Sequence, residues 1–259
     1  MKKQTGFTLV EIMIALLLGL IVVGATISIY IATVNSSAST IRSTRLNHDL
    51  EAVTTLMVND IRRAGYWAGA ADNIDDDNLF TATAGTITNI NILENGTCIL
   101  YSYDADNDTT VDADEFYGFK LQNNTIMIRL SGSATTDCND ANDTWQNFID
   151  NNQLTITTLR FSFAPIDVNA DGDTTDGGDL AATSRCWNQD RKTTTDALAC
   201  TCPTGTATDC NGEYIIQNRI VNISLSGRVS SDQIVTKTLS GTTEVRNNRI
   251  CEWDSANCP

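Results

Sequence analysis

The chain has 259 residues, with 17 Lys and Arg against 32 Asp and Glu, and its formal net charge is −15. This length allows one sizeable hydrophobic core or two small ones, and a hydrophobic share of 41% is typical of a folded protein. Because so acidic a chain is repelled by nucleic acid and by anionic lipid headgroups, we expect no direct nucleic acid binding.

The N-terminal segment predicts one membrane-spanning helix. A short basic leader, residues 1–6 (MKKQTG), precedes 23 uncharged residues at 12–34. As an α-helix this stretch rises about 35 Å and can cross a bilayer, whereas the apolar region of an ordinary secretory signal has about 7 to 15 residues. The positive leader is expected to stay in the cytoplasm, so the rest of the chain is exported.

Glu11 lies near the start of this apolar segment, where a plain membrane anchor gives no reason for a carboxylate. A charged residue near the middle of a membrane costs on the order of 2.5 to 3.5 kcal/mol, less near the edge, and usually finds a partner. A cut between Gly6 and Phe7 creates an α-amino group that can neutralise Glu11 of a neighbouring subunit as their helices pack together. Glu11 would then set the register of assembly and have no catalytic role.

The sequence GFTLVE at residues 6–11, followed by the long apolar helix, resembles the class III leader of type IV pilins and type II secretion pseudopilins. This resemblance implies that a prepilin peptidase cleaves after Gly6 and methylates Phe7, and that Glu11 is the assembly glutamate. It also implies a Gram-negative bacterium and a single-pass inner-membrane protein whose periplasmic head later enters an extracellular pilus.

The helix is predicted to continue beyond the membrane. Five apolar residues recur at spacings of 4, 3, 4 and 4, which places them on one helical face: Leu46, Leu50, Val53, Met57 and Ile61. Gly65 is the expected stop. We therefore divide the chain into a leader (1–6), a transmembrane or filament-core half of the helix (7–34), an amphipathic half (35–65) and a globular β-rich head (66–259).

Beyond Gly65 the pattern changes to alternating strands joined by polar loops. Strands are predicted at 86–93, 98–103, 117–130, 153–164, 214–229 and 233–245, with a hairpin turn at Asn123 and Asn124. The expected fold class is α+β, with a long N-terminal helix packed on an antiparallel β-sheet and with disulfide-bearing loops. The pilin resemblance implies the same architecture.

An acidic loop at residues 104–115 (DADNDTTVDADE) has the ligand spacing of an EF-hand calcium loop. Oxygen-bearing side chains fall at its positions 1, 3, 5, 7, 9 and 12: Asp104, Asp106, Asp108, Thr110, Asp112 and Glu115. Thr109 replaces the usual glycine at position six, and strands rather than helices flank the loop. Because six carboxylates within twelve residues repel one another unless a cation is bound, calcium is the predicted cofactor.

A second acidic loop at residues 167–179 (DVNADGDTTDGGD) matches the calcium pattern in its first half. Its candidate ligands are Asp167, Asn169, Asp171 and Asp173, with Gly172 at the sharp turn and Asp176 or Asp179 left to close the site. The alternative for both loops is a solvated turn, because Asp, Asn and Gly are ordinary loop residues. Bound calcium would order these loops and would take part in no reaction.

All eight cysteines follow the hydrophobic segment. An even number in an exported region favours disulfides, but about 105 pairings are possible and the sequence does not choose among them. Zinc is the competing interpretation, although there is no C-x-x-C pair and the single histidine, His48, is distant in sequence. The disulfide candidates are Cys98, Cys138, Cys186, Cys200, Cys202, Cys210, Cys251 and Cys258.

The sequence does not indicate an enzyme, because it has no GxSxG elbow, no P-loop and no HExxH motif. The segment NDIRRAGYWAG at 59–69, together with LYSYDADND, EFYGFKL and RIVNISLSGRV, resembles PilW-type minor pilins. This resemblance implies a minor pilin that primes or caps type IV pilus assembly, with the major pilin, other minor pilins, the prepilin peptidase and the inner membrane as partners. A GspJ-like pseudopilin of type II secretion and a tip-displayed adhesin are the alternatives.

Overall fold

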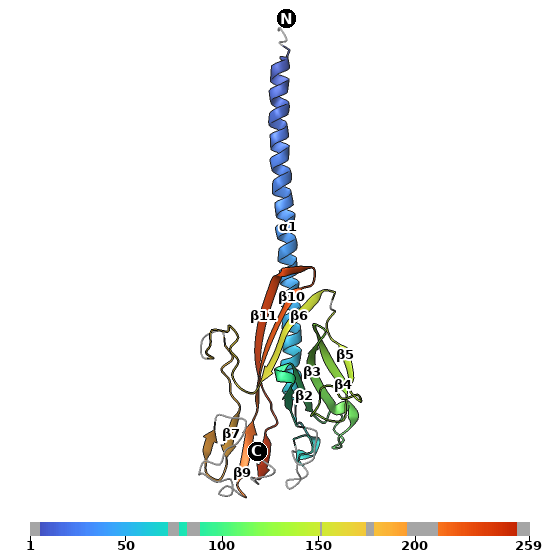
Figure 1. Cartoon of the computed structure of the whole chain (residues 1–259), viewed down its shortest axis with the longest axis vertical. Coiled ribbons are helices and arrows are strands. Elements are labelled where there is room, and N and C mark those ends of the chain that lie inside the picture. Colours follow the sequence, from blue (N-terminus) through green and yellow to red (C-terminus); the bar gives the residue numbers. More distant parts are fainter. Residues whose placement is uncertain are drawn as a thin grey trace. The chain divides into compact units, whose positions relative to one another are not determined.

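The computed structural model describes residues 6–71, 78–81, 89–150, 152–174, 179–195 and 212–252. These ranges contain one long α-helix, twelve strands and three short 3₁₀ helices, which are η1 (Ala68–Ala71), η2 (Glu94–Gly96) and η3 (Ala113–Glu115) (Figure 1). The chain divides into two compact units, Met1–Arg45 and Leu46–Pro259. The helix α1 (Leu9–Ile61) contributes to both units.

In the first unit, α1 is apolar on every side. The large apolar side chains from Leu9 to Val34 are 47–75% exposed. Within the described residues, α1 is the one helix that is long and apolar enough to cross a membrane. A helix with an apolar surface all round is suited to a hydrocarbon environment.

In the second unit, the last four turns of α1 form one wall of the hydrophobic core. The predicted stripe is confirmed, because Leu50, Met57 and Ile61 are 0% exposed and the other two members are buried as well. These side chains pack against residues such as Ile156, Ile223 and Leu225 from the strands that cross the helix.

The described strands form three antiparallel sheets. The first has the order β1 (Asn91–Leu93), β2 (Cys98–Ser102), β3 (Phe116–Gln122), β4 (Thr125–Ser131) and β5 (Thr144–Asn147). The second has the order β11 (Asp232–Glu244), β10 (Ile220–Val229) and β6 (Leu154–Ser162). The third has the order β12 (Arg249–Glu252), β9 (Tyr214–Asn218), β7 (Arg185–Asn188) and β8 (Thr193–Thr195). The α+β class is confirmed, with three sheets where one was expected.

The predicted hairpin is confirmed, since Asn123 and Asn124 have φ values of 52° and 60° between β3 and β4. The predicted strand at 214–229 is two strands, because β9 ends at Asn218 and β10 begins at Ile220, and each joins a different sheet. Residues 86–88 of the strand predicted at 86–93 lie outside the described residues, and the last three residues of that prediction form β1.

Two glycines allow the second sheet to approach α1 closely. A Cβ at Gly227 of β10 would lie 3.1 Å from Cδ2 of Leu50, and one at Gly241 of β11 would lie 3.1 Å from Cγ2 of Thr54. Thr243 Oγ1 also donates a hydrogen bond of 3.1 Å to the carbonyl of Val58. The helix and β11 are therefore joined by direct backbone proximity as well as by apolar packing.

The C-terminal end of α1 is capped by residues distant in sequence. In the turn after Ile61, the Arg62 carbonyl accepts the Arg246 N–H, and the carbonyls of Arg63 and Ala64 accept Asn247 Nδ2. Gly65 turns the chain with a φ of +72°, and its N–H donates to the carbonyl of Ser102. The helix therefore ends at Ile61, and Gly65 stops the turn that follows.

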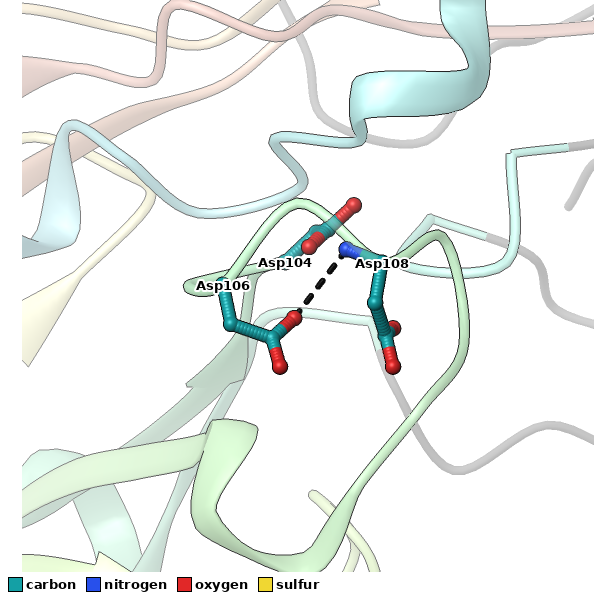
Figure 2. Close-up of side chains that lie close together, drawn as sticks. All are labelled: Asp104, Asp106 and Asp108. Atoms are coloured by element: carbon teal, nitrogen blue, oxygen red, sulfur yellow. Dashed lines mark hydrogen bonds between the residues drawn. The ribbon is translucent and has the colours of Figure 1, made fainter.

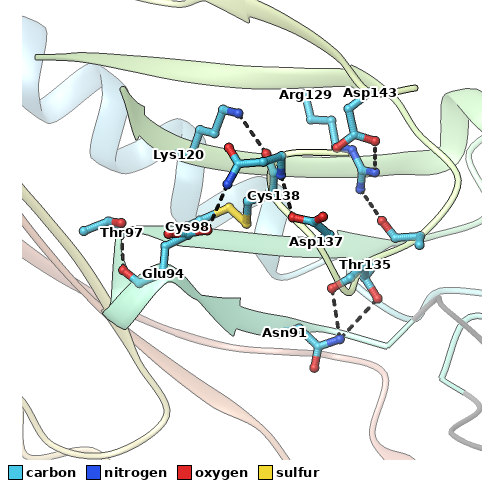
Figure 3. The surroundings of a disulfide bond; sticks show 12 residues. Asn91, Glu94, Thr97, Cys98, Lys120, Arg129, Thr135, Asp137, Cys138 and Asp143 are labelled. Atoms are coloured by element: carbon cyan, nitrogen blue, oxygen red, sulfur yellow. Dashed lines mark hydrogen bonds and ion pairs between the residues drawn. A yellow bond between two sulfur atoms is a disulfide. The ribbon is translucent and has the colours of Figure 1, made fainter. Parts of the chain in front are cut away.

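Cys98 and Cys138 form a disulfide across a sequence separation of 40 residues, joining β2 to the segment between β4 and β5 (Figure 3). Near it, Lys120 Nζ donates a hydrogen bond of 2.8 Å to the Cys138 carbonyl and lies 4.2 Å from the centre of the Trp145 ring. Burial lowers the pKa of Lys120.

Cys186 is also disulfide-bonded. Cys200, Cys202, Cys210, Cys258 and the side chain of Cys251 lie outside the described residues.

Candidate assembly and metal sites

The N-terminus of α1 is closed by a capping box. Glu11 N–H donates to Thr8 Oγ1 at 3.3 Å, and the Thr8 N–H donates to Glu11 Oε2 at 3.2 Å. The Thr8 hydroxyl adds a bond of 3.2 Å to the same carboxylate oxygen. The sequence TLVE carries the T-x-x-E signature of this motif, which the sequence analysis did not use. Glu11 therefore has a hydrogen-bonding partner within its own chain.

An open, shallow groove runs along one face of this part of the helix. It is lined by Phe7, Glu11, Ile12, Ala15, Leu16, Gly19, Leu20 and Val23. Glu11 is the one ionisable side chain among these eight residues, and a Cβ at Gly19 would have no atom within 4 Å. The face around Glu11 is thus apolar and open. A cationic group that approaches this face would find Glu11 as the one charged side chain to pair with among these residues.

The first acidic loop brings Asp104, Asp106 and Asp108 together, with their carboxylate oxygens within 4.8 Å of one another (Figure 2). Asp104 is 1% exposed, and its Oδ1 accepts the N–H of Asn107 at 2.7 Å. The N–H of Asp108 donates to Asp106 Oδ1 at 3.1 Å, as the dashed line in Figure 2 marks. These turns direct the carboxylates of alternate residues towards one region.

The second loop repeats this pattern of turns. In both loops the side chain of the first residue, an Asp, accepts the backbone N–H groups of the fourth and sixth residues. The side chain of the third residue accepts the N–H of the fifth residue, and the side chain of the fifth residue accepts the N–H of the seventh. These acceptors are Asp104, Asp106 and Asp108 in the first loop and Asp167, Asn169 and Asp171 in the second. Two segments of different sequence therefore adopt the same succession of turns.

The backbone conformation at the sixth position shows that the first loop forms its turn without a glycine. Thr109 has a φ of +71°, and Gly172, its counterpart, has a φ of +101°. A non-glycine residue at this φ is strained, but the Thr109 N–H gains a bond of 3.3 Å to the buried Asp104 carboxylate. A positive φ at the sixth position is therefore present in both loops.

The remaining predicted ligands of the first loop form hydrogen bonds of their own. Asp112 caps η3, and Glu115 accepts the N–H groups of Ala105 at 2.7 Å and of Asp112 at 3.1 Å. Burial raises the pKa of Glu115, whereas the hydrogen bonds from Thr110 lower that of Asp108. The Thr110 hydroxyl donates to Asp108 Oδ1 at 2.7 Å.

In the second loop, Asp179 lies with Asp167 and Asp171, again with carboxylate oxygens within 4.8 Å. Its Oδ1 accepts the Val168 N–H at 2.9 Å, and its Oδ2 is buried without a hydrogen-bond partner among the described residues. Asp173 contributes its N–H to the turn. Asp176 lies outside the described residues. Asp179 is therefore the described carboxylate that faces the first half of this loop.

The first loop is tied to the segment that leaves α1. Asp104 Oδ2 accepts the N–H of Ala68 at 3.0 Å, and the Asp104 N–H donates to the Tyr66 carbonyl at 2.9 Å. The Tyr66 hydroxyl also donates to Asn107 Oδ1 at 3.0 Å. Ordering this loop therefore also orders the exit of the helix.

Asp60, near the end of α1, joins the helix to a group of tyrosines that the sequence analysis did not identify. Its carboxylate accepts the hydroxyl of Tyr101 at 2.5 Å and that of Tyr103 at 3.1 Å. Tyr103 stacks on Tyr117 with ring centres 4.1 Å apart, and Arg63 lies 4.0 Å above the Tyr103 ring. Burial raises the pKa of all three tyrosines, and Asp60 adds to the rise.

Two protein-family models match the chain. Residues 1–27 match the prokaryotic N-terminal methylation motif, and residues 39–245 match the family described as prepilin peptidase-dependent protein B. Comparisons with curated proteins and with solved structures found no match. The two matches support processing by a prepilin peptidase, and they fit an inner-membrane anchor with a periplasmic head. Since the second match spans well over half of the sequence, the chain belongs to the prepilin peptidase-dependent protein B family of pilin-like proteins.

Proposed function

We propose that this chain is a PilW-type minor pilin that primes or caps the assembly of a type IV pilus. The observation that carries the proposal is a methylation motif at residues 1–27 on the same helix whose last turns form the core of a β-rich head. Such a chain is held in the membrane at one end and presents a folded head at the other. The families that match consist of structural pilin-like proteins, which favours assembly over catalysis.

Glu11 is the residue to which we assign the assembly step. Cleavage between Gly6 and Phe7 and methylation of Phe7 leave a cationic amino group at the start of each mature subunit. In our proposal this group from a neighbour replaces the hydrogen bonds that Thr8 gives to Glu11 in the isolated chain. A charge pair in an apolar surrounding is stronger than a hydrogen bond to a neutral hydroxyl, so the exchange favours the assembled state.

The test separates processing from assembly. Gly6→Leu should leave a larger, uncleaved protein, because the peptidase would no longer accept the residue before the cut. Glu11→Ala should be cleaved normally but reduce piliation, and Glu51→Gln, which removes an exposed carboxylate further along α1, serves as the matched control. Normal cleavage of Gly6→Leu, or full piliation with Glu11→Ala, would contradict the corresponding assignment.

Piliation of a deletion strain distinguishes the related roles. Loss of filaments indicates priming. Normal filaments that no longer adhere indicate a tip-displayed adhesin, and a defect confined to protein secretion indicates a GspJ-like pseudopilin.

We further propose that Ca²⁺ binds the two acidic loops and stabilises the head. The shared turns, the positive φ at the sixth position and the three grouped carboxylates in each loop support oxygen coordination of a hard cation. Asp104, Asp106 and Asp108 would hold the ion in the first loop, and Asp167, Asp171 and Asp179 in the second. The ion would offset the repulsion among carboxylates that face one another.

Calcium titration of metal-free protein tests this proposal. A ligand that binds only the folded state adds about 2.7 kcal/mol at one hundred times its dissociation constant, so the melting temperature should rise with Ca²⁺ and fall with chelator. Asp108→Asn and Asp171→Asn report on the loops separately, because each removes a charge at an exposed position. An identical melting curve with and without Ca²⁺ would sink the proposal.

A further inference from the structure

A second groove lies on the head, between α1 and the segment that joins β5 to β6. Its volume is about 240 Å³, which is the size of one large side chain with some surrounding space. The lining residues are Asp49, Ala52 and Val53 from the helix, Phe148, Ile149, Asp150 and Gln153 from the segment, and Leu154 from the start of β6. All of them belong to the unit Leu46–Pro259.

The walls of this groove are fixed by the fold. Val53 is 4% exposed and Leu154 is 2% exposed, so both belong to the core. The Phe148 N–H donates to the Ile126 carbonyl at 2.8 Å, and the Ile149 carbonyl accepts the Thr125 hydroxyl at 3.0 Å. Asp150 accepts the N–H and the Nδ2 of Asn152, each at 2.9 Å, which holds its carboxylate in a turn. The groove is therefore preformed.

The groove combines an apolar surface with two carboxylates, those of Asp49 and Asp150. The Phe148 residue is 41% exposed, and the Asp49 side chain is 40% exposed. None of the eight lining residues is a cation. His48 Nδ1 lies 3.5 Å from Asp49 Oδ1, and the His48 side chain is 83% exposed. A large aromatic ring left in water beside two carboxylates is typical of an interaction surface.

We propose that this groove receives an arginine or lysine side chain from a different pilin subunit. The methylene stem of such a side chain packs on the apolar wall, and its charged end reaches Asp49 and Asp150. An arginine also stacks on the exposed face of Phe148. Two carboxylates on an apolar wall are too few oxygen ligands for a bound metal ion. A second copy of this chain, with a net charge of −15, is repelled, so the partner is a subunit of another kind.

This inference rests on the proposed function, since it requires a neighbouring subunit, and the experiment separates the two. The photo-reactive amino acid p-benzoylphenylalanine is placed at Gln153 in the full-length protein, in cells that assemble pili. A second strain carries it at Ile21, on the exposed apolar part of α1. Cross-linked peptides are identified by mass spectrometry.

We expect the Gln153 probe to label one segment of another pilin that contains an Arg or Lys. Asp49→Asn combined with Asp150→Asn should lower that yield about fivefold, as the loss of two partly exposed ion pairs implies, and Glu51→Gln on the same helix should not. Asp49→Lys, combined with Glu in place of the partner's cation, should restore the yield.

Three results would overturn the inference: a labelled segment without a basic residue, labelling of a second copy of this chain, or a yield that the double variant leaves unchanged. Labelling of pilins from Ile21 but not from Gln153 refutes the groove and leaves the proposed function standing. If neither probe labels a pilin subunit, both proposals fail together.

Discussion

The two parts of α1 use apolar residues in opposite ways. From Leu9 to Val34 the large apolar side chains are 47–75% exposed and lie on all sides of the helix. In the last four turns the large apolar residues are concentrated on one face, and Leu50, Met57 and Ile61 are 0% exposed. The first part has an apolar surface suited to lipid or to other helices, whereas the second has a single apolar face that its own head covers.

This difference separates assembly from folding along one helix. Burying a Leu side chain contributes about 1.5 to 3 kcal/mol, and in the second part that free energy belongs to the folding of the head. In the first part the same side chain is available for membrane insertion and, under the proposed function, for contacts with other subunits. Substitutions in the two parts should therefore be detected by different assays.

The largest effect expected from a single substitution is the loss of a core side chain of α1. Leu50→Ala should lower the free energy of unfolding of the head by about 2 to 5 kcal/mol, because it removes buried methyl groups beside Gly227 and leaves a cavity. Denaturant unfolding of the full chain in detergent micelles, followed by tryptophan fluorescence, measures the change.

Leu17→Ala is the matched control for this substitution. Leu17 is 60% exposed in the first part of α1, so its truncation should leave the unfolding free energy of the head unchanged. Equal destabilisation by both variants would show that the two parts of the helix do not divide their roles as we infer.

Alkaline pH should have the next largest effect, and it should act on the second part of α1. Tyr101 and Tyr103 donate hydrogen bonds to Asp60, and burial together with this carboxylate raises the pKa of both hydroxyls above 10. The unfolded chain ionises near pH 10, whereas the folded chain keeps these hydroxyls protonated. Their contribution to stability is therefore complete below pH 10 and is lost as the pH rises above it.

The loss should be about 1.4 kcal/mol per pH unit for each tyrosine that stays protonated in the fold. Urea unfolding at a series of alkaline pH values measures the slope. Tyr101→Phe should make the slope shallower, because one of the groups responsible is removed. A slope that is the same in this variant and in the parent protein would mean that Tyr101 titrates alike in both states.

Local periodicity and turn chemistry account for most of what the sequence predicted correctly. The spacing of Leu46 to Ile61 identified the buried face of α1, and two successive Asn residues identified the β3–β4 hairpin. The short strands β5 (TWQN) and β7 (RCWN) were missed because four residues with few aliphatic side chains give no clear alternation. They are strands because neighbouring strands supply their hydrogen bonds.

The candidate sites show the same limit. Three of the six ligands predicted from spacing in the first loop, Asp104, Asp106 and Asp108, lie together, since each turn is formed by bonds two to five residues apart. The pairing of Cys98 with Cys138 was not predictable, because it depends on how β2 and the β4–β5 segment meet in the sheet. The groove beside Asp49 likewise joins residues about one hundred positions apart in sequence.

The smallest expected effect concerns the other end of the helix. Thr8→Ala removes the hydroxyl that bonds to Glu11 and should weaken the first turn of α1 by about 1 kcal/mol, the usual cost of losing an N-terminal cap. Amide hydrogen exchange of residues 9–12 in micelles should become faster, while the unfolding free energy of the head stays constant. Thr8→Ser keeps the hydroxyl and should behave like the parent protein.

Piliation then shows whether this cap does more than start the helix. If Glu11 acts through a charge pair with a neighbour, Thr8→Ala should reduce piliation far less than Glu11→Ala, because the carboxylate remains available to the incoming amino group. If the two variants were equally defective, the contribution of Glu11 would be the local capping box. The first part of α1 would then need only a well-formed helix, and the pairing of subunits through Glu11 would lose its support.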